Sequence, residues 1–449
     1  MKKLLCLILS LCLLAAFGGC NGDAPEETTL QTTESTTPEE PRELDIYYLR
    51  ETLSTAQSIV QKYTLSHRNV SVNATAFNSI EEMDLQIASE ISAGKGPDVI
   101  LFPDTTTLDT AKMARNGAFL DLSEMLAADT TYSADNYYPV LDAGRISGGQ
   151  YLMPLRMKFM YMMTTQEKFS DALALQEGYT LQQLMQALTE NAAQCPEDKS
   201  AMHTMHKVDT YLYDLLRLGN IQIVDTESLM QTVSRETVEE YAAFAQMAYG
   251  QMLKAAGHMR EYSPNDLAEA CRRNTAILTD QSMPGWVRYY GAIYDQALNE
   301  EFQLISYPNQ TDANKVTVDI PLYAAVVKKT DNAQDAYSFV RYAMDYSFSN
   351  INEQLPVSKQ GVTGLLNNLS ANTGKTITVH SFTVKVGRMT AEQETYCKSL
   401  LDRITSGSIP NAGIEAIFTE AMGSYITGEA DFDSCYQKFE NQLGIYLYE

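Results

Sequence analysis

Aromatic, acidic and basic side chains at predicted strand ends and turns carry the binding chemistry of this sequence. Aromatic rings offer flat apolar surfaces, and carboxylates and guanidinium groups exchange hydrogen bonds with hydroxyl-rich compounds. Trp286 is the only tryptophan and directly follows a Pro-Gly turn, where it predicts a stacking surface. The candidate ligand-binding residues are Trp286, Phe102, Asp104, Arg156, Tyr289, Tyr290, Tyr48 and Asp319.

These residues also have structural interpretations. Trp286 could hold a hydrophobic core together, and Asp104 could cap the helix that follows it. Arg156 could form a structural ion pair. Tyr289 and Tyr290 are adjacent, so on one helix or strand they cannot both face the same ligand. The sequence leaves these alternatives open.

Motifs for catalysis and metal binding are weak. The chain has no Gly-x-Ser-x-Gly nucleophile motif, and Gly374-Lys375-Thr376 lacks the first glycine of a phosphate loop because position 369 is leucine. His203 and His206 have no acidic partner at a useful spacing. The sequence therefore predicts no catalytic residue, no cofactor and no metal site.

The elements that position the candidates begin with an alternation of strands and helices. Residues 44–49 and 70–77 have the composition and alternation of strands. Residues 80–91 repeat apolar positions at helical spacing after a capping Ser79, and Gly94 suits the turn that ends the helix. Residues 99–102 form an apolar run typical of a strand covered on both faces. This order predicts a doubly wound α/β lobe in which Asp104 follows a strand at a ligand crevice.

The N-terminus has the pattern of an exported protein. A basic head precedes an apolar run at residues 4–17, which predicts a signal peptide over residues 1–19. Phe17-Gly18-Gly19-Cys20 resembles a bacterial lipobox, which implies that Cys20 is lipidated; a plain signal peptide with a chance cysteine is the alternative. Residues 20–43 are rich in Thr, Glu and Pro and are expected to form a disordered tether. We therefore expect an extracytoplasmic protein anchored to the outer face of the bacterial cell membrane.

Composition limits what remains. About 400 residues follow the tether, enough for two lobes, and 45% of the chain is hydrophobic. Once Lys2 and Lys3 are removed with the signal, 57 acidic residues face 31 basic ones, a net charge of −26 that argues against nucleic-acid binding. Cys195, Cys271, Cys397 and Cys435 are far apart. A Cys397–Cys435 disulfide and buried free thiols both remain open.

Several motifs occur in an order that resembles one family. Residues 94–100, followed by residues 116–122, resemble the first lobe of the extracellular solute-binding proteins of ABC importers, the group that includes the maltose-binding protein. Residues 148–155 resemble its first crossing into the second lobe, and residues 355–359 its last crossing. Residues 276–286 resemble its strand and turn that end in a ligand-facing aromatic residue. The resemblance covers essentially the whole mature chain. Residues 163–168 replace the Tyr-Asn-Lys that is common after the first crossing, so the chain departs from the family on the presumed ligand side.

The resemblance implies a periplasmic-binding-protein-like α/β fold of type II, with two lobes, a hinge and a ligand cleft. We expect one lobe over residues 44–153 and 309–352, and the other over residues 154–308 and 353–449. The implied function is that of a monomeric, lipid-anchored receptor that captures a small solute, with a mono- or oligosaccharide favoured, and delivers it to ABC importer permease subunits. A surface glycan-binding lipoprotein without transport, or a secreted hydrolase, is the alternative.

Overall fold

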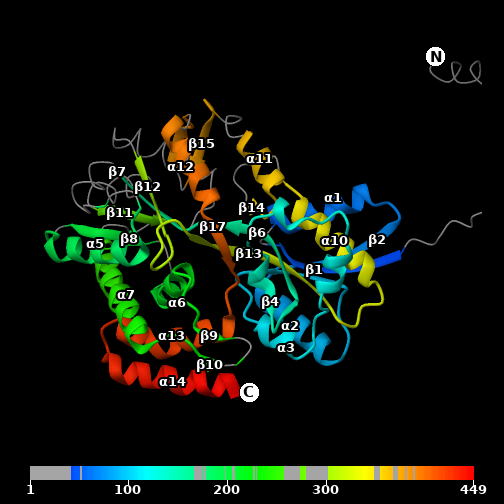
Figure 1. The fold of residues 1–449 in the computed structure, drawn as a ribbon, viewed down its shortest axis with the longest axis horizontal. Coiled ribbons are helices and arrows are strands. Elements are labelled where there is room, and N and C mark those ends of the chain that lie inside the picture. Colours follow the sequence, from blue (N-terminus) through cyan, green and yellow to red (C-terminus); the bar gives the residue numbers. More distant parts are fainter. Residues whose placement is uncertain are drawn as a thin grey trace, which may run out of the picture. The chain divides into compact units, whose positions relative to one another are not determined.

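The computed structural model describes residues 42–50, 53–165, 175, 178–197, 199–204, 208–225, 228, 230–256, 274–279, 302–347, 354–367, 373–379, 382–387 and 390–448. Two sheets with their own helices make up this part of the chain (Figure 1). None of the described helices is long and apolar enough to cross a membrane.

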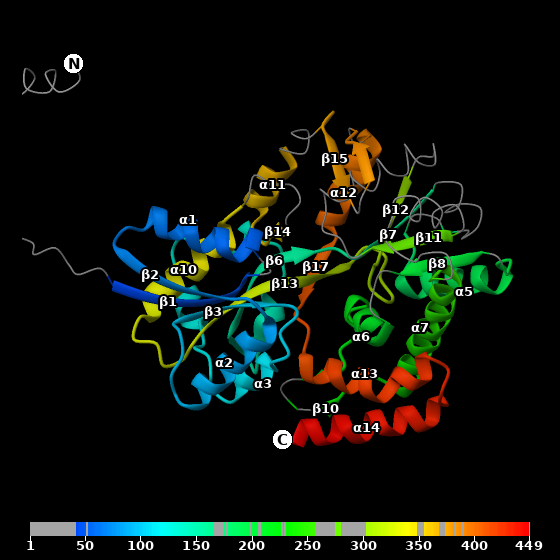
Figure 2. The ribbon, with the colours of Figure 1, turned by 180° about the vertical axis from the view of Figure 1, so that it is seen from behind.

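The larger sheet has the strand order β14-β6-β13-β3-β1-β2, and β17 also pairs with β13. Strand β1 is parallel to β2 and β3, whereas β13 runs antiparallel to β3 and β6. The strands are β1 (Arg42–Leu49), β2 (Val70–Phe77), β3 (Val99–Pro103), β6 (Leu152–Lys158), β13 (Val316–Val326), β14 (Leu355–Pro356) and β17 (Ile404–Ser408). Helices α1 (Ser58–Ser66) and α10 (Ala333–Asp345) cover one face, and α2 (Ile80–Ser92) and α3 (Thr110–Arg115) the other (Figures 1 and 2).

The predicted order of strands and helices at the start of the fold is confirmed. Ser79 caps α2 by accepting a hydrogen bond from the Glu82 N–H at 3.2 Å, and Gly94 has a φ of 69° in the turn after the helix. All five residues of β3 are buried, as expected of a strand covered on both faces. The fold is therefore α/β in this region, with helices on both faces of the parallel strands β1, β2 and β3.

The smaller sheet has the order β12-β7-β11-β8. Its strands are β7 (Tyr161–Thr165), β8 (Ser200–Thr204), β11 (Asn274–Thr279) and β12 (Phe302–Ser306). Its helices are α5 (Leu181–Gln194), α6 (Val208–Leu218), α7 (Arg235–Ala256), α13 (Ala412–Ile426) and α14 (Phe432–Tyr448).

The remaining elements are short or connect these two groups. They are a π-helix (Leu53–Gln57), α4 (Ser123–Ala128), two 3₁₀ turns (Ala134–Asn136 and Leu141–Gly144), the strand pairs β4 (Arg145–Ile146) with β5 (Gly149–Gln150), β9 (Val224–Asp225) with β10 (Met230–Gln231) and β15 (Thr376–Val379) with β16 (Phe382–Lys385), and helices α11 (Lys359–Asn367) and α12 (Ala391–Asp402).

Two separate hydrophobic cores divide the chain. The first core holds buried side chains from residues 44–161 and 316–404 together with Leu304, and the second holds those from residues 160–307 and 414–443. The chain therefore passes between them three times, at about residues 158–162, 304–316 and 404–414.

The last of these passages lies later than the expected boundary at residue 353. β14 pairs with β6 and keeps Leu355 on the larger sheet, and α12 also packs in the first core, so the chain leaves that core only after β17. Cys397 is a buried free thiol in the first core and Cys435 one in the second, so the thiol alternative holds for this pair.

Candidate functional site

The pairing of β6 with β13 brings charged residues to the junction of the two cores. Lys158 lies opposite Asp319, whereas Leu322 lies opposite Arg156, and the register shifts on both sides of Leu322. Pro321 stands beside the first shift and has no N–H to give to a ladder. Because such irregularities re-aim side chains, the end of this strand pair can carry charges that a regular ladder would not place there.

Asp104 joins this group from the end of β3. Its N–H donates to the Pro321 carbonyl at 3.1 Å, and its carboxylate accepts a hydrogen bond from the Lys158 Nζ at 3.0 Å. The two side chains are 24% and 21% exposed, so water or a solute can reach both. Asp104 does not cap α3, because Asp109 fills that position by accepting from the Lys112 N–H.

A buried arginine links the second core to the same strand. Arg217 on α6 bonds Asp319 on β13 and Asp214 on its own helix, each at 2.6 Å. It also donates to the Ser408 Oγ on β17 at 3.1 Å. The Arg217 and Asp319 side chains are only 7% and 8% exposed. Burial acts to lower the pKa of Arg217, but the carboxylates of Asp319 and Asp214 hold that pKa above its usual range.

A second polar contact joins the cores through α3. Asp109, the cap of α3, accepts hydrogen bonds from the Tyr446 hydroxyl on α14 and from the Asn411 Nδ2. The Asn411 N–H in turn donates to the Tyr213 hydroxyl at 2.7 Å, and its Oδ1 caps α13. Burial and then the Asp109 hydrogen bond raise the pKa of Tyr446 to about 12, so its hydroxyl stays a donor at neutral pH.

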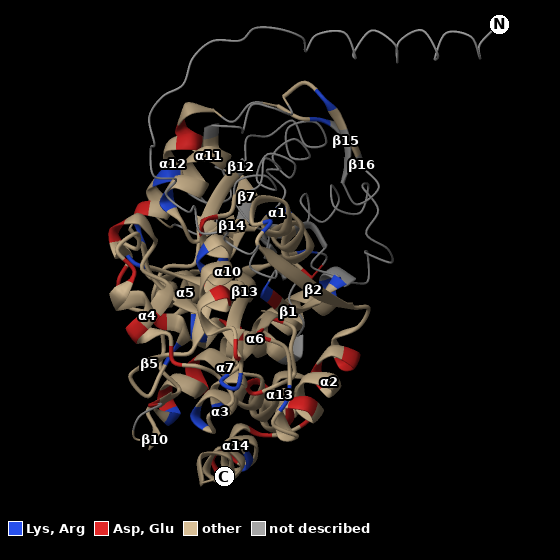
Figure 3. Cartoon of the chain, turned by 90° about the vertical axis from the view of Figure 1, so that its right-hand side faces the viewer, with Lys and Arg blue, Asp and Glu red and all other residues tan. Residues whose placement is uncertain are grey.

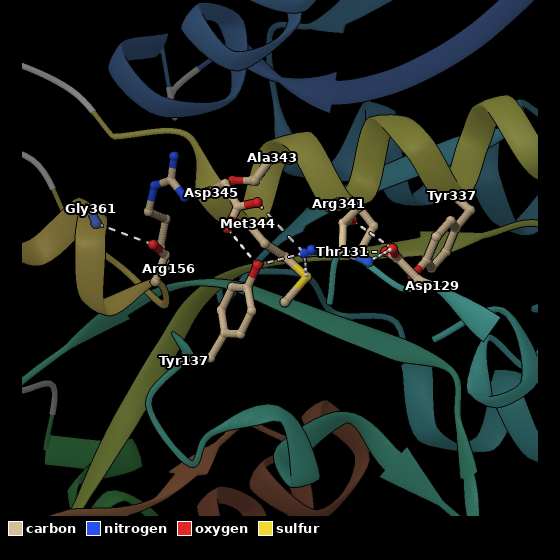
Figure 4. Close-up of polar contacts among 11 residues, drawn as sticks. Asp129, Thr131, Tyr137, Arg156, Tyr337, Arg341, Ala343, Met344, Asp345 and Gly361 are labelled. Carbon is tan, nitrogen blue, oxygen red and sulfur yellow. Dashed lines mark hydrogen bonds and ion pairs between the residues drawn. The ribbon is translucent and has the colours of Figure 1, made fainter. Parts of the chain in front are cut away.

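Three predicted ligand residues lie inside the first core in this conformation. Phe102 is fully buried and stacks on Tyr323, with ring centroids 5.6 Å apart. Tyr48 is buried in the same core. Arg156 is also fully buried and lies beside Ala343 of α10 (Figure 4). Its guanidinium donates to the backbone carbonyls of Leu155, Ala343 and Tyr346. Their ligand role stays a prediction, since none of the three offers its side chain to solvent here.

The aromatic candidates Trp286, Tyr289 and Tyr290 lie outside the described residues, and so does His206. The structure therefore brings together two of the predicted residues, Asp104 and Asp319.

Sequence reasoning missed the residues that bind these two aspartates. The Asp214–Arg217 spacing of three residues is a readable helical pair. The further partner of Arg217, Asp319, lies 102 residues away, and no local pattern signals that contact. Lys158 follows Arg156 by two residues, which puts it near the same strand end without naming its partner.

A cavity of about 600 Å³ also spans elements of both cores. It is lined by Tyr179 and by Gln303 on β12 from one side, and by Tyr396 and Arg403 at α12 from the other. The Tyr179 hydroxyl donates to the Ser306 carbonyl at 3.0 Å, and the Ser306 N–H donates to the Tyr396 hydroxyl at 3.3 Å. Its size is within the range of small-molecule pockets.

α12 and the contact between α3 and α14 lie on opposite sides of the connecting strands (Figures 1 and 2).

Two sheets, two cores, three connecting passages and charged contacts between the cores define a two-lobed α/β binding protein of the periplasmic type II fold. A family model described as bacterial extracellular solute-binding protein matches residues 48–345. The chain therefore belongs to this family of bacterial extracellular solute-binding proteins.

Solved structures share the fold at low sequence identity. The sugar-binding protein MalE from Xanthomonas citri aligns with a TM-score of 0.65 and 11% identity, over 90% of this chain and 97% of that one. The cyclic alpha-maltosyl-1,6-maltose binding protein from Arthrobacter globiformis aligns with a TM-score of 0.58 and 13% identity, over 91% and 99%. An ABC substrate-binding protein from Listeria monocytogenes, solved with cycloalternan, aligns with a TM-score of 0.57 and 12% identity, over 90% and 97%. No curated protein matches the sequence.

Proposed function

We propose that this protein is the substrate-binding receptor of an ABC importer and that its solute is a mono- or oligosaccharide. The observation that carries the proposal is the junction of the two cores, where Arg217 of the second core binds Asp319 beside the partly exposed Asp104–Lys158 pair. The sugar class is supported by the relatives that bind sugars, such as MalE from Xanthomonas citri. The protein acts by binding and release, without catalysis.

The two cores are the two lobes of this receptor. One lobe comprises residues 42–158 and 316–408, and the other residues 160–307 and 409–448. A solute that contacts both lobes binds the closed state more tightly than the open state and so favours closure. Asp104 and Lys158 offer an acceptor and donors for hydroxyl groups, and Trp286 supplies the stacking surface, together with either Tyr289 or Tyr290.

The receptor is anchored through a lipid on Cys20 and works as a monomer beside the permease. The expected tether, residues 20–43, overlaps β1 at Arg42 and Glu43. This arrangement is supported by the lipobox-like residues before Cys20. Cys20→Ser is expected to release the protein from cells into the medium, as measured by immunoblot of cell and medium fractions. Retention of the variant on cells would contradict the anchor.

A thermal-shift panel of sugars, peptides and polyamines, read together with Trp286 fluorescence, tests the function. At a concentration 100 times its Kd, a ligand stabilises the folded state by about 2.7 kcal/mol, so the right sugar raises the melting temperature clearly. Asp104→Asn is expected to reduce this shift. Asp433→Asn is the matched control, because it removes the acid of an exposed ion pair between Asp433 on α14 and Arg235 on α7.

Two outcomes would count against the receptor. If no compound changed the melting temperature or the emission, the transport function would lose its support. If a bound glycan were hydrolysed, the protein would be an enzyme.

A further inference from the structure

The first lobe has a lysine-rimmed pocket of about 670 Å³, whose lining reaches the α3–α14 contact between the cores at Asp109 and Lys112. It lies between the C-terminal ends of α2 and α3 and the residues that follow β13. Its apolar lining is formed by Ile91, Leu108, Met113, Ala118 and Val327, among others. Its basic lining consists of Lys95, Lys112, Lys328 and Lys329.

The charge of this pocket is opposite to that of the protein. The chain carries a net charge of −24, and Asp109 is the only carboxylate among the described lining residues. That carboxylate is bonded by Tyr446 and Asn411. Lys95, Lys328 and Lys329 are exposed, and within the described part of the chain none of them forms an ion pair. Figure 3 shows acidic residues on α2. Glu81 and Glu82 lie in its first turn, whereas Glu90 lies in its last turn and accepts hydrogen bonds from the Tyr47 hydroxyl and the Gln86 side chain.

Two glycines place two of these ammonium groups at helix ends. The Lys329 Nζ lies 2.7 Å from where a Cβ on Gly94 would stand, and the Lys328 Nζ lies 3.5 Å from the corresponding point on Gly117. Gly94 follows α2 and Gly117 follows α3, both with positive φ. The partial negative charge at a helix C-terminus attracts a cation within its last turn. The helix ends therefore hold the two amines in place but do not neutralise them as a carboxylate would.

Lysine amines over an apolar floor suit a phosphate group attached to a small carbon skeleton. An ammonium binds phosphate oxygens as a point charge, and the apolar lining can cover glycerol or acyl carbons. A neutral sugar carries no charge that the four lysine ammonium groups could neutralise. The pocket thus differs in chemistry from the solute site at the junction.

The pocket lies at the end of the larger sheet at which β1, the first strand of the fold, begins. Val99 at the start of β3 pairs with Ile46 of the parallel strand β1, and with Val326 at the end of β13. Lys95 precedes β3 and Lys328 follows β13, so both lie at the same end of the sheet as Arg42, where β1 begins. The residues that follow the proposed anchor at Cys20 enter the fold at this end of the sheet, through Arg42 of β1.

We propose that this pocket binds the phosphate group of an anionic phospholipid headgroup and thereby orients the receptor on the membrane that anchors it. The orientation rests on the proposed anchor, whereas binding of the headgroup does not. The lipid anchor supplies most of the membrane affinity. The pocket determines which edge of the first lobe faces the bilayer.

The experiment titrates dihexanoyl phosphatidylglycerol, below its micellar concentration and at low salt, into the unlipidated full chain carrying Cys20→Ser. Binding is measured by calorimetry. We expect saturable binding that Lys328→Glu with Lys329→Glu weakens at least about 25-fold, since each lysine near an anionic lipid contributes a factor of about five. Lys328→Gln with Lys329→Gln should weaken lipid binding less than the glutamate variant does, because it adds no negative charge at the helix ends.

Lys62→Glu with Lys254→Glu is the matched control, because both lysines are exposed on other helices and the net charge changes equally. The control should bind the lipid like the parent chain, and the sugar-induced thermal shift should be the same in all variants. An equal loss in the control, no binding at all, or equal binding of dihexanoyl phosphatidylcholine would overturn the proposal. Tighter binding of inorganic phosphate than of the lipid would also overturn it, as a site for the free anion. These results leave the sugar test unaffected, so the two proposals fail separately.

Discussion

Two buried arginines of this protein make similar contacts in different places. Arg341 on α10 bonds the Asp129 carboxylate and the Tyr137 hydroxyl (Figure 4). Its guanidinium also lies over the rings of Tyr132 and Tyr137. Arg217 on α6 bonds Asp319 and Asp214 and lies over the ring of Tyr213. Both combine a guanidinium, carboxylates and tyrosine.

The difference is what each cluster connects. All partners of the Arg341 cluster come from residues 129–137 and α10, within the first lobe. The Arg217 cluster joins a helix of the second lobe to β13 and β17 of the first. The same chemistry therefore stabilises one lobe in the first case and fixes one lobe against the other in the second. Changes at Arg217 should alter both the stability of the protein and its affinity for the solute. Changes at Arg341 should alter the stability and leave the affinity as it is.

The largest effect is expected from Arg217→Met. It leaves Asp319, which is 8% exposed, buried beside Asp214 without its cation. Breaking a buried ion pair by removing one partner costs about 3–5 kcal/mol. Urea unfolding should show this loss, and the affinity for the solute should change as well because the link between the lobes is gone.

The control for this change is Arg217→Met combined with Asp319→Leu. Without the uncompensated carboxylate of Asp319, much of the lost stability should return. A loss of less than about 1 kcal/mol in the single variant, or no gain from the second substitution, would contradict the role of this pair.

A smaller effect, with a distinct pH dependence, is expected from Arg341→Met. The pKa of Asp129 lies well below its usual range, chiefly because the Thr131 hydroxyl donates a hydrogen bond to the carboxylate. Burial raises this pKa, but hydrogen bonds from Arg341 and Tyr337 lower it further. A carboxyl with a lowered folded-state pKa stabilises the protein above its unfolded value of about 3.9, and this stabilisation is lost as the pH falls further. The variant should lose about 2–3 kcal/mol at pH 7, because Thr131 and Tyr337 still bond the carboxylate.

The measurement is urea unfolding at pH 7 and pH 3. Stability of the parent chain should fall more steeply between these values than that of Arg341→Met, and the solute-induced shift at pH 7 should be unchanged. Lys438→Met removes the cation of an exposed pair with Glu420 and should leave the pH slope as it is. A changed solute affinity in Arg341→Met would remove the distinction between the two arginines.

The sequence predicted the local parts of this fold well, because they rest on short-range patterns. Residues 80–92 show one apolar helical face and a capping serine, and residues 99–102 show a buried strand. The same apolar run explains why Phe102 lies in the core: it is the fourth residue of a strand covered on both faces. Its position at the strand end favoured a ligand role, but Asp104, two residues later, is the residue that reaches solvent.

The contacts between the lobes depend on long-range pairing that no local pattern encodes. Arg217 meets Asp319 because α6 packs near β13, and Lys158 meets Asp104 because the β6–β13 register shifts around Leu322. The last passage between the cores was expected near residue 353, where a proline motif follows. A two-residue strand, β14, keeps that stretch on the larger sheet, and pairing of this length leaves little trace in a sequence.

The smallest effect tests the comparison most sharply, because two tyrosines donate to aspartates in the same way. Tyr446 on α14 donates to Asp109 across the lobes, and Tyr337 on α10 donates to Asp129 within the first lobe at 2.9 Å. Tyr446→Phe and Tyr337→Phe each remove one hydroxyl, at a cost of about 1 kcal/mol. If the Tyr446–Asp109 contact forms only when the lobes close, the first variant weakens the closed state by about a factor of five, and the solute Kd rises by about as much. In the second variant, the stability falls and the Kd stays the same. Calorimetric titration of the solute into both variants measures the difference, and equal Kd values would mean that the α3–α14 contact does not bias closure.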